Sequence, residues 1–532
     1  MTIEAGVPRR GNETPAHNRK SRPGRQSWTS RALQIVSPSC AGSAGRPNRN
    51  HTILAGGVCK GSAHSFSDSL ETFMRKTHNG APALKRTDSP CVDLFSFVGS
   101  ARKHPALALQ SFERAFKVAP ELALRILLWA RDAREGAGER DTFRFILHWL
   151  ERRHPTVVAA LVRAGAVQQF GRWDDLLHLQ SDAVWPAVEE QVLAALANGD
   201  RLAAKWMPRS GPVAARLRKT LGANEQTWRL GLAALSDTVE QRMCASKWDE
   251  VDFARVPSVA GARLQKAFRA HDGERYAAFL EDVKAGRSTM KAGAVFPHDI
   301  VKAAMHDDAA ATVQWSQLPK PVLAGGALVL CDVSGSMGCK VSGTTTALDV
   351  CVALGLLLSE NLPEPFRNQV LTFCGAPSWH RVEGDTLATR AASLLGARWD
   401  MNTNIQAAFD LILARAKAAR AAGVVFEMPK TLVVLSDMEF DSPGIRGRTN
   451  HQVLERKFRA AGFEVPTLVY WNLNGRAGNV PGGNRPGVVL VSGYSPRIAD
   501  IVLSGAFEQL TPELVMREAV CVPRYDIAGV TV

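Results

Sequence analysis

An apolar run that ends in a cluster of oxygen-bearing side chains most constrains the fold of this chain. The run, Ala327–Cys331, contains no polar residue, as is typical of a strand buried on both faces of a parallel sheet. Asp332, Ser334 and Ser336 follow it directly. Because ligands of open α/β sheets bind beyond the carboxyl ends of the strands, these side chains indicate a binding site. Mg²⁺ prefers carboxylate and hydroxyl oxygens, whereas zinc favours the thiols and imidazoles that this motif lacks.

The rest of the C-terminal half alternates predicted strands and helices. Ala347–Glu360 is apolar on nearly every face, which predicts a helix packed against a sheet. Asn402–Asn404 precede apolar residues at helical spacing, which places Thr403 at the start of a helix. Further apolar strands are expected at Asn368–Phe373, Thr431–Leu435, Thr467–Trp471 and Val488–Val491, the second of them followed by Ser436 and Asp437. This alternation predicts a doubly wound α/β sheet.

In order and position, the polar residues of this half resemble the metal-ion-dependent adhesion site of the von Willebrand factor A domain. The resemblance implies that Mg²⁺ or Mn²⁺ is bound by Asp332, Ser334, Ser336, Thr403 and Asp437. It also implies an open coordination position for an acidic side chain of a protein partner. One departure is that Trp399–Asn402 stands where a glycine-rich turn is common in that family.

The charge of the chain is unevenly distributed. The net charge of +14 arises from 12 basic and 4 acidic residues in 1–78, 34 and 28 in 79–320, and 19 and 19 in 321–532. The basic excess of the first two segments favours an anionic partner such as nucleic acid. An ordinary solvated surface explains the same excess in 79–320.

No apolar run approaches the roughly 18 residues that span a bilayer, so no membrane segment is expected. The nine cysteines include no C-x-x-C pair, and Cys331 and Cys374 fall in or beside predicted core strands. They indicate buried thiols in a reducing compartment, and hence a cytoplasmic protein.

Residues 1–75 are rich in Arg, Ser, Gly and Pro, which predicts a disordered basic tail. An electrostatic arm for nucleic acid, an organelle transit peptide and an extension without function all fit this composition. Trp28 among Arg22, Arg25 and Arg31 is compatible with stacking on a base.

Residues 79–320 show helical periodicity without a repeat of fixed length. Helices of similar length, separated by short breaks, are expected at Glu121–Arg134, Asp141–Arg153, Thr156–Phe170, Val184–Asn198, Pro212–Leu221, Asn224–Ser236, Ala260–His271 and Glu274–Ala285. Such a series predicts an irregular, HEAT-like α-helical repeat domain. It is followed by the α/β domain at 325–510 and by a segment, 511–532, expected to pack on both. Gln314–Gly326, with Pro319 and Pro321, forms a short junction that favours packing of the two domains against each other.

Several phrases in both halves resemble a family of uncharacterised two-part proteins with a helical front and a von Willebrand A back. In the front half these are ARDAREGAGER (130–140), FGRWDDLL (170–177), AAKWMP (203–208), HDGERY (271–276) and FPHDIV (296–301), and in the back half SDMEF (436–440), WNL (471–473) and SGY (492–494). In architecture, and in the R-x-G-x-G-E-R and G-R-W-D-D-L phrases, the chain more distantly resembles the Ro (TROVE) proteins. That resemblance implies binding of structured noncoding RNA.

The sequence therefore predicts a non-enzymatic binding protein, with structured RNA bound by the helical domain and a partner bound through the metal. RNA contact is expected at five cations within 15 residues, Lys205, Arg209, Arg216, Arg218 and Lys219, although a solvated helix face explains the same cluster. One alternative is a metal-dependent protein-interaction adaptor without RNA, and a weaker one is a metal-dependent hydrolase. A two-metal hydrolase would need more carboxylates than Asp332 and Asp437, and only Glu439 and Asp441 lie close by in sequence. The oligomeric state is not indicated.

Overall fold

The computed structural model describes residues 74–321, 326–373, 375–397, 402–445, 447–503, 510–527 and 530. The predicted basic tail, Cys374 and Trp399–Met401 therefore lie outside the described residues, apart from the last two positions of the tail. Within the described chain, Val192–Asp237 make one compact unit, and the remaining residues make another. No helix of the described residues is long and apolar enough to cross a membrane.

The N-terminal half is helical, and several of its helices begin with a proline at the first turn. Proline suits that position because its fixed φ is helical and its missing N–H would have no partner there. The helices of this half that lie wholly in the larger unit, with or without an initial proline, are α3 (Pro90–Val98), α4 (Pro105–Val118), α5 (Pro120–Arg131), α6 (Asp141–Arg153), α7 (Pro155–Arg163), α8 (Ala166–Phe170), α9 (Trp173–Leu176), α14 (Val239–Cys244), α15 (Ser258–Lys284), α16 (Pro297–Ala304) and α17 (Asp308–Ser316).

The smaller unit is built from the end of α10 (Trp185–Ala197) and from α11 (Arg201–Trp206), α12 (Gly211–Leu221) and α13 (Glu225–Leu235). Trp228 is its largest fully buried side chain, and its indole N–H donates to the Pro208 carbonyl at 2.9 Å. A buried indole needs such a partner, because an unmade hydrogen bond costs free energy.

One helix prediction needs correction, and another is confirmed by a kink. The helix expected at Thr156–Phe170 is two helices, α7 and α8, because Gly165 between them takes a positive φ of 74°. The pair expected at Ala260–His271 and Glu274–Ala285 is confirmed, since α15 (Ser258–Lys284) consists of two helices joined at a kink with non-helical backbone at Asp272. The kink at Asp272 falls inside the break that the sequence predicts.

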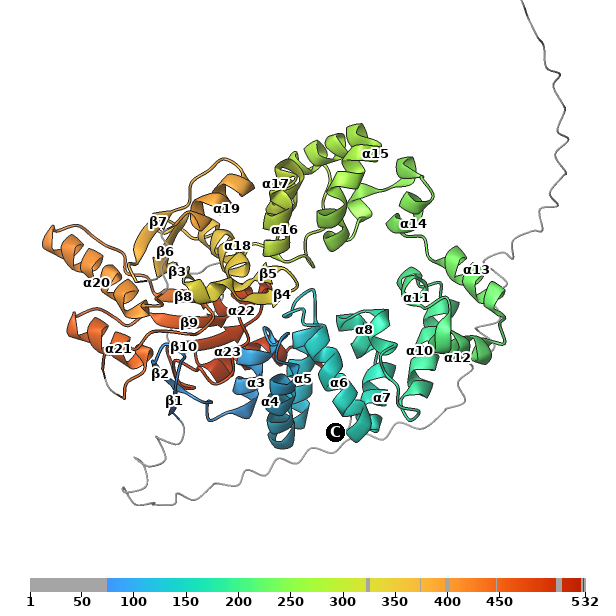
Figure 1. Cartoon of the computed structure of the whole chain (residues 1–532), viewed down its shortest axis with the longest axis horizontal. Coiled ribbons are helices and arrows are strands. Elements are labelled where there is room, and N and C mark those ends of the chain that lie inside the picture. The colour runs from blue at the N-terminus through green and yellow to red at the C-terminus, as the bar shows by residue number, and fades with distance from the viewer. Residues whose placement is uncertain are drawn as a thin grey trace, which may run out of the picture. The chain divides into compact units, whose positions relative to one another are not determined.

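The C-terminal half is a six-stranded mixed sheet (Figure 1). Its spatial order is β10-β9-β8-β3-β6-β7, and all neighbouring pairs are parallel except β6 with β7. The antiparallel edge strand was not predicted, and it follows from the short link after β6, which has no room for a crossover helix. The strands are β3 (Ala327–Asp332), β6 (Gln369–Phe373), β7 (Ser378–Arg381), β8 (Thr431–Ser436), β9 (Thr467–Asn472) and β10 (Val488–Ser492).

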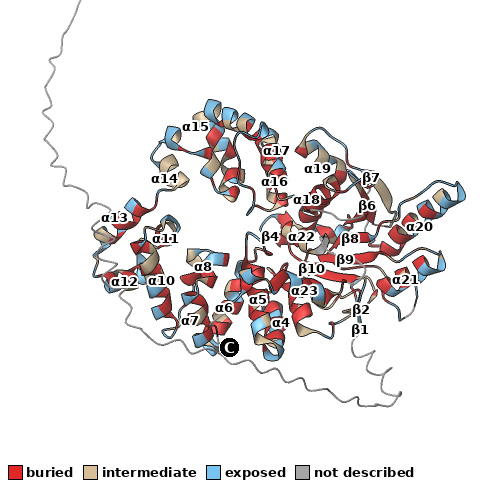
Figure 2. Cartoon of the chain, turned by 180° about the vertical axis from the view of Figure 1, so that it is seen from behind, coloured by how far each residue is buried: buried red, intermediate tan, exposed pale blue. Residues whose placement is uncertain are grey.

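The strands at the centre of this sheet are fully buried, as the apolar runs predict. Every residue of β3, β8, β9 and β10 is buried (Figure 2). The predicted helix α18 (Ala347–Glu360) is observed with its predicted bounds and packs on β3, β8 and β6. The other helices of this half are α19 (Leu387–Leu395), α20 (Ile405–Ala421), α21 (Asn450–Ala460) and α22 (Arg497–Leu503).

The chain order of the strands places a topological switch point between β3 and β8. From β3 the chain passes to β6 on one side, and from β8 it passes to β9 on the other. At such a point the connections diverge and open a crevice beyond the carboxyl ends of the two strands. Asp332 ends β3 and Asp437 directly follows β8, so both carboxylates are delivered to this crevice.

The front of the helical half packs on the sheet domain. The hairpin β1 (Met74–Lys76) and β2 (Pro82–Leu84) forms isolated bridges to the back half at Asp441 and Val480. Helix α3 packs on β10, and the Gly99 amide at its end donates to the Ser492 hydroxyl at 3.0 Å. The first residues of the predicted helical domain thus contact the α/β domain directly.

The two halves also meet beside the predicted junction and at the C-terminal segment. The Trp315 indole on α17 donates to the Glu360 carboxylate of α18 at 2.9 Å. In the C-terminal segment, α23 (Pro512–Val520) packs on α5, α3 and β10. Beyond it, Arg524 and the Tyr525 hydroxyl both bind the buried Asp132 carboxylate, at 2.6 and 3.0 Å.

Candidate metal centre

Asp332 is fully buried at the end of β3 and is held by two hydrogen bonds. Its Oδ1 accepts from the Ser334 amide at 3.0 Å, and its Oδ2 accepts from the Ser436 hydroxyl at 2.6 Å. The Ser436 hydroxyl also accepts from the Met438 amide at 3.0 Å. The last residue of β8 therefore joins the loop after β3 to the loop after β8.

The two predicted serine ligands lie in the turn that follows β3. Ser334 is fully buried and Ser336 is half-buried, at the start of a 3₁₀ turn, Gly335–Gly338. Their hydroxyl oxygens are 3.0 Å apart. The hydroxyl pair therefore stands directly beside the end of the Asp332 strand, as the sequence predicts.

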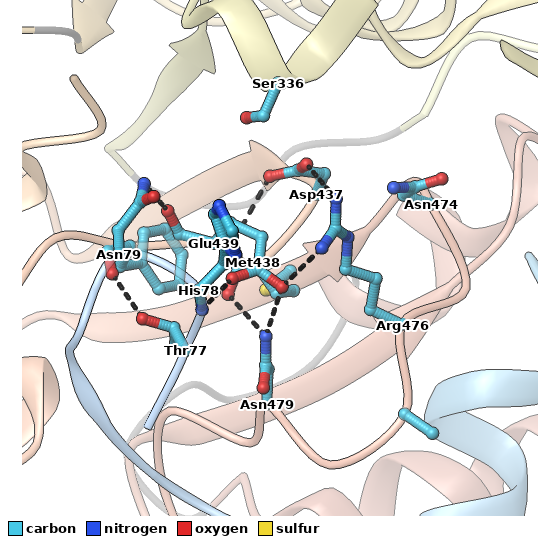
Figure 3. A network of polar contacts seen from close by, with 12 residues as sticks. Thr77, His78, Asn79, Ser336, Asp437, Met438, Glu439, Asn474, Arg476 and Asn479 are labelled. Carbon is cyan, nitrogen blue, oxygen red and sulfur yellow. Dashed lines mark hydrogen bonds and ion pairs between the residues drawn. The ribbon is translucent and has the colours of Figure 1, made fainter. Parts of the chain in front are cut away.

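Asp437, the second predicted carboxylate, has one oxygen that receives no hydrogen bond from the described residues. Its Oδ1 accepts from the Glu439 amide at 3.2 Å, whereas the buried Oδ2 has only an ion pair with the Arg476 Nη2 at 3.6 Å (Figure 3). Met438, which separates Asp437 from Glu439 in the sequence, has a positive φ of 66°. This is an unfavourable conformation for a residue with a side chain, and such strain is found most often at functional sites.

Thr403 is fully buried and is fixed by its main chain to Asp441. The Thr403 amide donates to Asp441 Oδ2 at 2.9 Å, and the Asp441 amide donates to the Thr403 carbonyl at 3.0 Å. The N-cap of α20 is the next residue, Asn404, whose side chain accepts from the Ala407 amide at 3.0 Å. The Thr403 hydroxyl is consequently not used as the helix cap, and it accepts from Asn79 Nδ2 at 3.5 Å.

Burial raises the pKa of both predicted carboxylate ligands, Asp332 and Asp437. Burial and the neighbouring charge of Asp437 raise the pKa of Asp332 to about 7. Burial also raises the pKa of Asp437, against the opposing effect of Arg476. A divalent cation between them would offset both the desolvation and the repulsion.

The donor set fits a hard cation that takes oxygen ligands. Two carboxylates and three hydroxyls meet the preference of Mg²⁺, which also retains water ligands. Among the described residues, no group of three or more His, Cys, Asp and Glu side chains is arranged to hold a metal. The buried Asp437 Oδ2 is an acceptor that makes no hydrogen bond with the described residues, which is uncommon for a buried polar atom.

Four residues that the sequence analysis did not assign to the site contact Glu439, two positions after Asp437 (Figure 3). Arg476 Nη1 and Asn479 Nδ2 both donate to Glu439 Oε1 at 2.7 Å, and the His78 amide donates to Oε2 at 2.6 Å. Asn79 donates to the Glu439 carbonyl at 2.8 Å. Arg476 lies in the loop after β9, and the carboxyl end of β9 is at the same edge of the sheet as the carboxyl ends of β3 and β8. This position after a parallel strand is the sequence signal by which Arg476 could have been found.

The two additional carboxylates near the motif are both occupied by structural contacts. Glu439 accepts the three hydrogen bonds just described, and Asp441 holds the Thr403 amide. Neither resembles a carboxylate held open for a second metal ion.

The five cations expected to contact RNA lie on the smaller unit and have different environments. Arg209 Nη1 donates to the Ala204 and Met207 carbonyls at 2.9 and 2.7 Å, which satisfies the C-terminal end of α11. Arg218 forms an ion pair with Glu225 at 3.5 Å, whereas Lys219 is exposed. Lys205 lies over the Trp206 ring, with its Nζ 5.9 Å from the centroid, and Arg216 is half-buried. RNA contact at these residues stays a prediction.

The fold and the site define a two-part protein, with a helical N-terminal half followed by a domain built on a mixed sheet. Residues 77–201 and 214–324 match the model of a domain of unknown function, DUF2828. Residues 326–520 match the model of a second domain of unknown function, DUF7788. The two matches divide the chain at the junction between its helical and α/β parts.

The chain is 25% identical over 500 residues to the uncharacterized protein L728 of Acanthamoeba polyphaga mimivirus, covering 82% of this chain and 85% of the relative. Among solved structures it is similar to the crystal structure of the Deinococcus radiodurans RO (RSR) protein, with a TM-score of 0.36 and 15% identity. That match covers 84% of this chain and 96% of the other. At this TM-score the similarity supports no inference about function.

Proposed function

We propose that the C-terminal half is a von Willebrand A-like domain with a metal-ion-dependent adhesion site, and that the protein acts as a non-enzymatic binding protein. The observation that carries this proposal is the buried Asp437 Oδ2, which receives no hydrogen bond and lies beside a second buried carboxylate, Asp332. A bound Mg²⁺ or Mn²⁺ ion would supply a positive charge able to attract an acidic group.

The ligands of the ion would be Asp332, Ser334, Ser336, Thr403 and Asp437. Ser336 is the one member of this set that is not buried, which makes its side of the site the approach for a partner. A carboxylate from a protein partner would complete the coordination from that side. This part of the proposal also holds for an adaptor that binds no RNA.

The contacts around the site support a metal-dependent hydrolase less well than a binding protein. Two-metal catalysis requires carboxylates that bridge or flank two ions about 4 Å apart. Glu439 and Asp441 are the nearby candidates, and their oxygens already bind His78, Asn479, Arg476 and the Thr403 amide.

Calorimetric titration of the full chain with Mg²⁺ and Mn²⁺ tests the metal site. Asp332→Ala should abolish binding, and Thr403→Ala should weaken it, because four ligands remain. Asp410→Ala is the matched control, since this carboxylate is exposed on α20 and pairs with Lys457 at 2.8 Å. Unchanged affinity in Asp332→Ala would contradict the assignment.

For the helical half we propose binding of structured RNA, in the manner that its resemblance to Ro proteins implies. The support is its basic excess, 34 basic against 28 acidic residues in 79–320, beside a neutral back half. The buried free thiols Cys91, Cys331 and Cys351 support a reducing location, the cytoplasm. Sequencing of nucleic acid that copurifies with the chain tests RNA binding, and its absence at low salt would favour the adaptor.

A further inference from the structure

A cavity of about 460 Å³ in the larger unit brings together several of the sequence phrases that the metal site leaves unexplained. Its lining comes from the loop before α4, the end of α5, the loops around α6 and α9, α15, α16 and the loop before α16, residues 342–345, and the loop after β10. These segments carry the REGAGER, FGR, FPHD and SGYSPR phrases. Its volume falls in the range of about 300 to 1,000 Å³ that is usual for small-ligand sites.

Positive side chains dominate the lining. Only two carboxylates, Asp141 and Asp299, are part of the described lining. Four of the cations form ion pairs with carboxylates that are not part of the lining. Arg102 pairs with Glu139 at 2.6 Å and Arg131 with Asp175 at 2.7 Å. Lys302 pairs with Asp349 at 3.0 Å and Arg497 with Asp500 at 3.3 Å. The cations of the lining are Arg102, Arg131, Arg140, Arg172, Arg263, Lys302 and Arg497.

The Arg102 guanidinium is held by two aromatic rings and a buried carboxylate. Its guanidinium carbon lies 4.6 Å from the centroid of Tyr494 and 5.2 Å from that of Phe296, and its Nε binds the buried Glu139. Gly138 makes room for this arrangement, because its φ is 73° and a Cβ there would lie 3.1 Å from the Phe296 ring. A guanidinium fixed in this way presents its donors without losing side-chain entropy on binding.

His298 adds a polar group that has no partner among the described residues. It is 3% exposed and lines the cavity, and its Nδ1 makes no hydrogen bond. Burial, with Arg102 and Lys302 nearby, lowers the pKa of His298 to about 3, so the ring is neutral at pH 7. A buried ring nitrogen without a partner is costly, which points to a polar ligand in this cavity.

We propose that this cavity binds a phosphate ester, either a free nucleotide or the terminal phosphate of an RNA strand. Guanidinium groups match phosphate oxygens in geometry and charge, and His298 adds a neutral polar ring to the same lining. The RNA source rests on the proposed function of the helical half, whereas the nucleotide source does not.

Calorimetry on the full chain can test the cavity with adenosine 5′-monophosphate and adenosine, and with a short single-stranded RNA that carries or lacks a terminal phosphate. Arg263→Gln and His298→Phe should each weaken binding of the phosphorylated probes by about tenfold. Arg263 is exposed on α15, so its substitution leaves the core intact even if His298→Phe disturbs it. Arg287→Gln is the matched control, because this arginine follows the same helix and pairs with Asp282 outside the cavity.

The outcomes separate this proposal from the proposed function. Phosphate-dependent binding of the mononucleotide, with no RNA bound, would support the cavity and overturn RNA binding. If both cavity variants bind RNA and adenosine 5′-monophosphate with the affinity of the wild type, RNA binding stands and the cavity proposal is overturned. Equal binding of phosphorylated and unphosphorylated probes would also overturn it.

Discussion

The side-chain amide of Asn79 donates to the main-chain carbonyl of Glu439 at 2.8 Å, although 360 positions separate the two residues. The same amide donates to the Thr403 hydroxyl at 3.5 Å. The segment that precedes the helical half thus forms one wall of the candidate metal centre. Asn79 therefore links the N-terminal segment to Thr403, one of the proposed ligands.

Thr77 anchors this segment, and its loss should destabilise the protein. Its hydroxyl donates to the Phe440 carbonyl at 2.8 Å and accepts from the Ala81 amide at 2.9 Å, both in buried surroundings. Thr77→Ala leaves two buried groups unpaired and should cost about 1 to 3 kcal/mol in the free energy of unfolding. Chemical denaturation measures this, with the exposed Thr220→Ala as control. Equal stability of the two variants would mean that water replaces the Thr77 hydroxyl.

Removal of the Arg476 charge should strengthen metal binding. Its guanidinium lies 3.6 Å from Asp437 Oδ2, where it competes with a cation for that oxygen. Arg476→Gln should therefore raise Mg²⁺ affinity about three- to tenfold, while the amide can still donate to Glu439. Arg485→Gln, which removes an arginine paired with Glu455, serves as the control in the same titration. Weaker binding in Arg476→Gln would show that the arginine supports the site instead of competing for it.

Gly99 is a position where any side chain would disturb the contact between the two halves. A Cβ at Gly99 would lie 2.2 Å from the Ser492 carbonyl oxygen. Gly99→Ala should lower the free energy of unfolding by about 3 kcal/mol, because α3 must move away from β10. At Gly273 in α15 a Cβ would meet no atom within 4 Å, so Gly273→Ala should change the free energy of unfolding by less than about 1 kcal/mol. Thermal melts of the two variants make the comparison, and similar losses would contradict it.

Glu139 should make stability depend on pH. Burial raises the pKa of its carboxyl from 4.5 to about 7, against the favourable charge of Arg102. Because the folded-state pKa is the higher one, the stabilising contribution is complete below about pH 4.5 and is lost as pH rises through 7.

Glu139→Gln removes this titration. Between pH 5 and 8 the wild type should lose about 2 to 3 kcal/mol more stability than the variant. Denaturant unfolding curves at several pH values compare the two proteins. Parallel pH profiles would show that Glu139 stays ionised in the folded state.

Much of the α/β half could be predicted from local sequence. Ala327–Asp332 and Thr431–Ser436 are apolar enough to be central strands, and a central parallel strand delivers the residue after it to the carboxyl edge. This argument places Asp332 and Asp437 together before any coordinate is known. It also brings Ser334 and Ser336 to that edge, since both are only a few positions from the strand.

The tertiary structure alone decided which groups surround these ligands. Asn79 and Arg476 reach Glu439 from segments before the first helix and after β9, and the cavity beside Arg102 and His298 is closed by segments far apart in sequence. The strand β7 likewise pairs antiparallel at the edge of the sheet. Periodicity reports only which face of an element is buried, and it carries no information about the partner on that face. Contacts between distant segments depend on the packing of whole helices and strands, and only the folded chain fixes them.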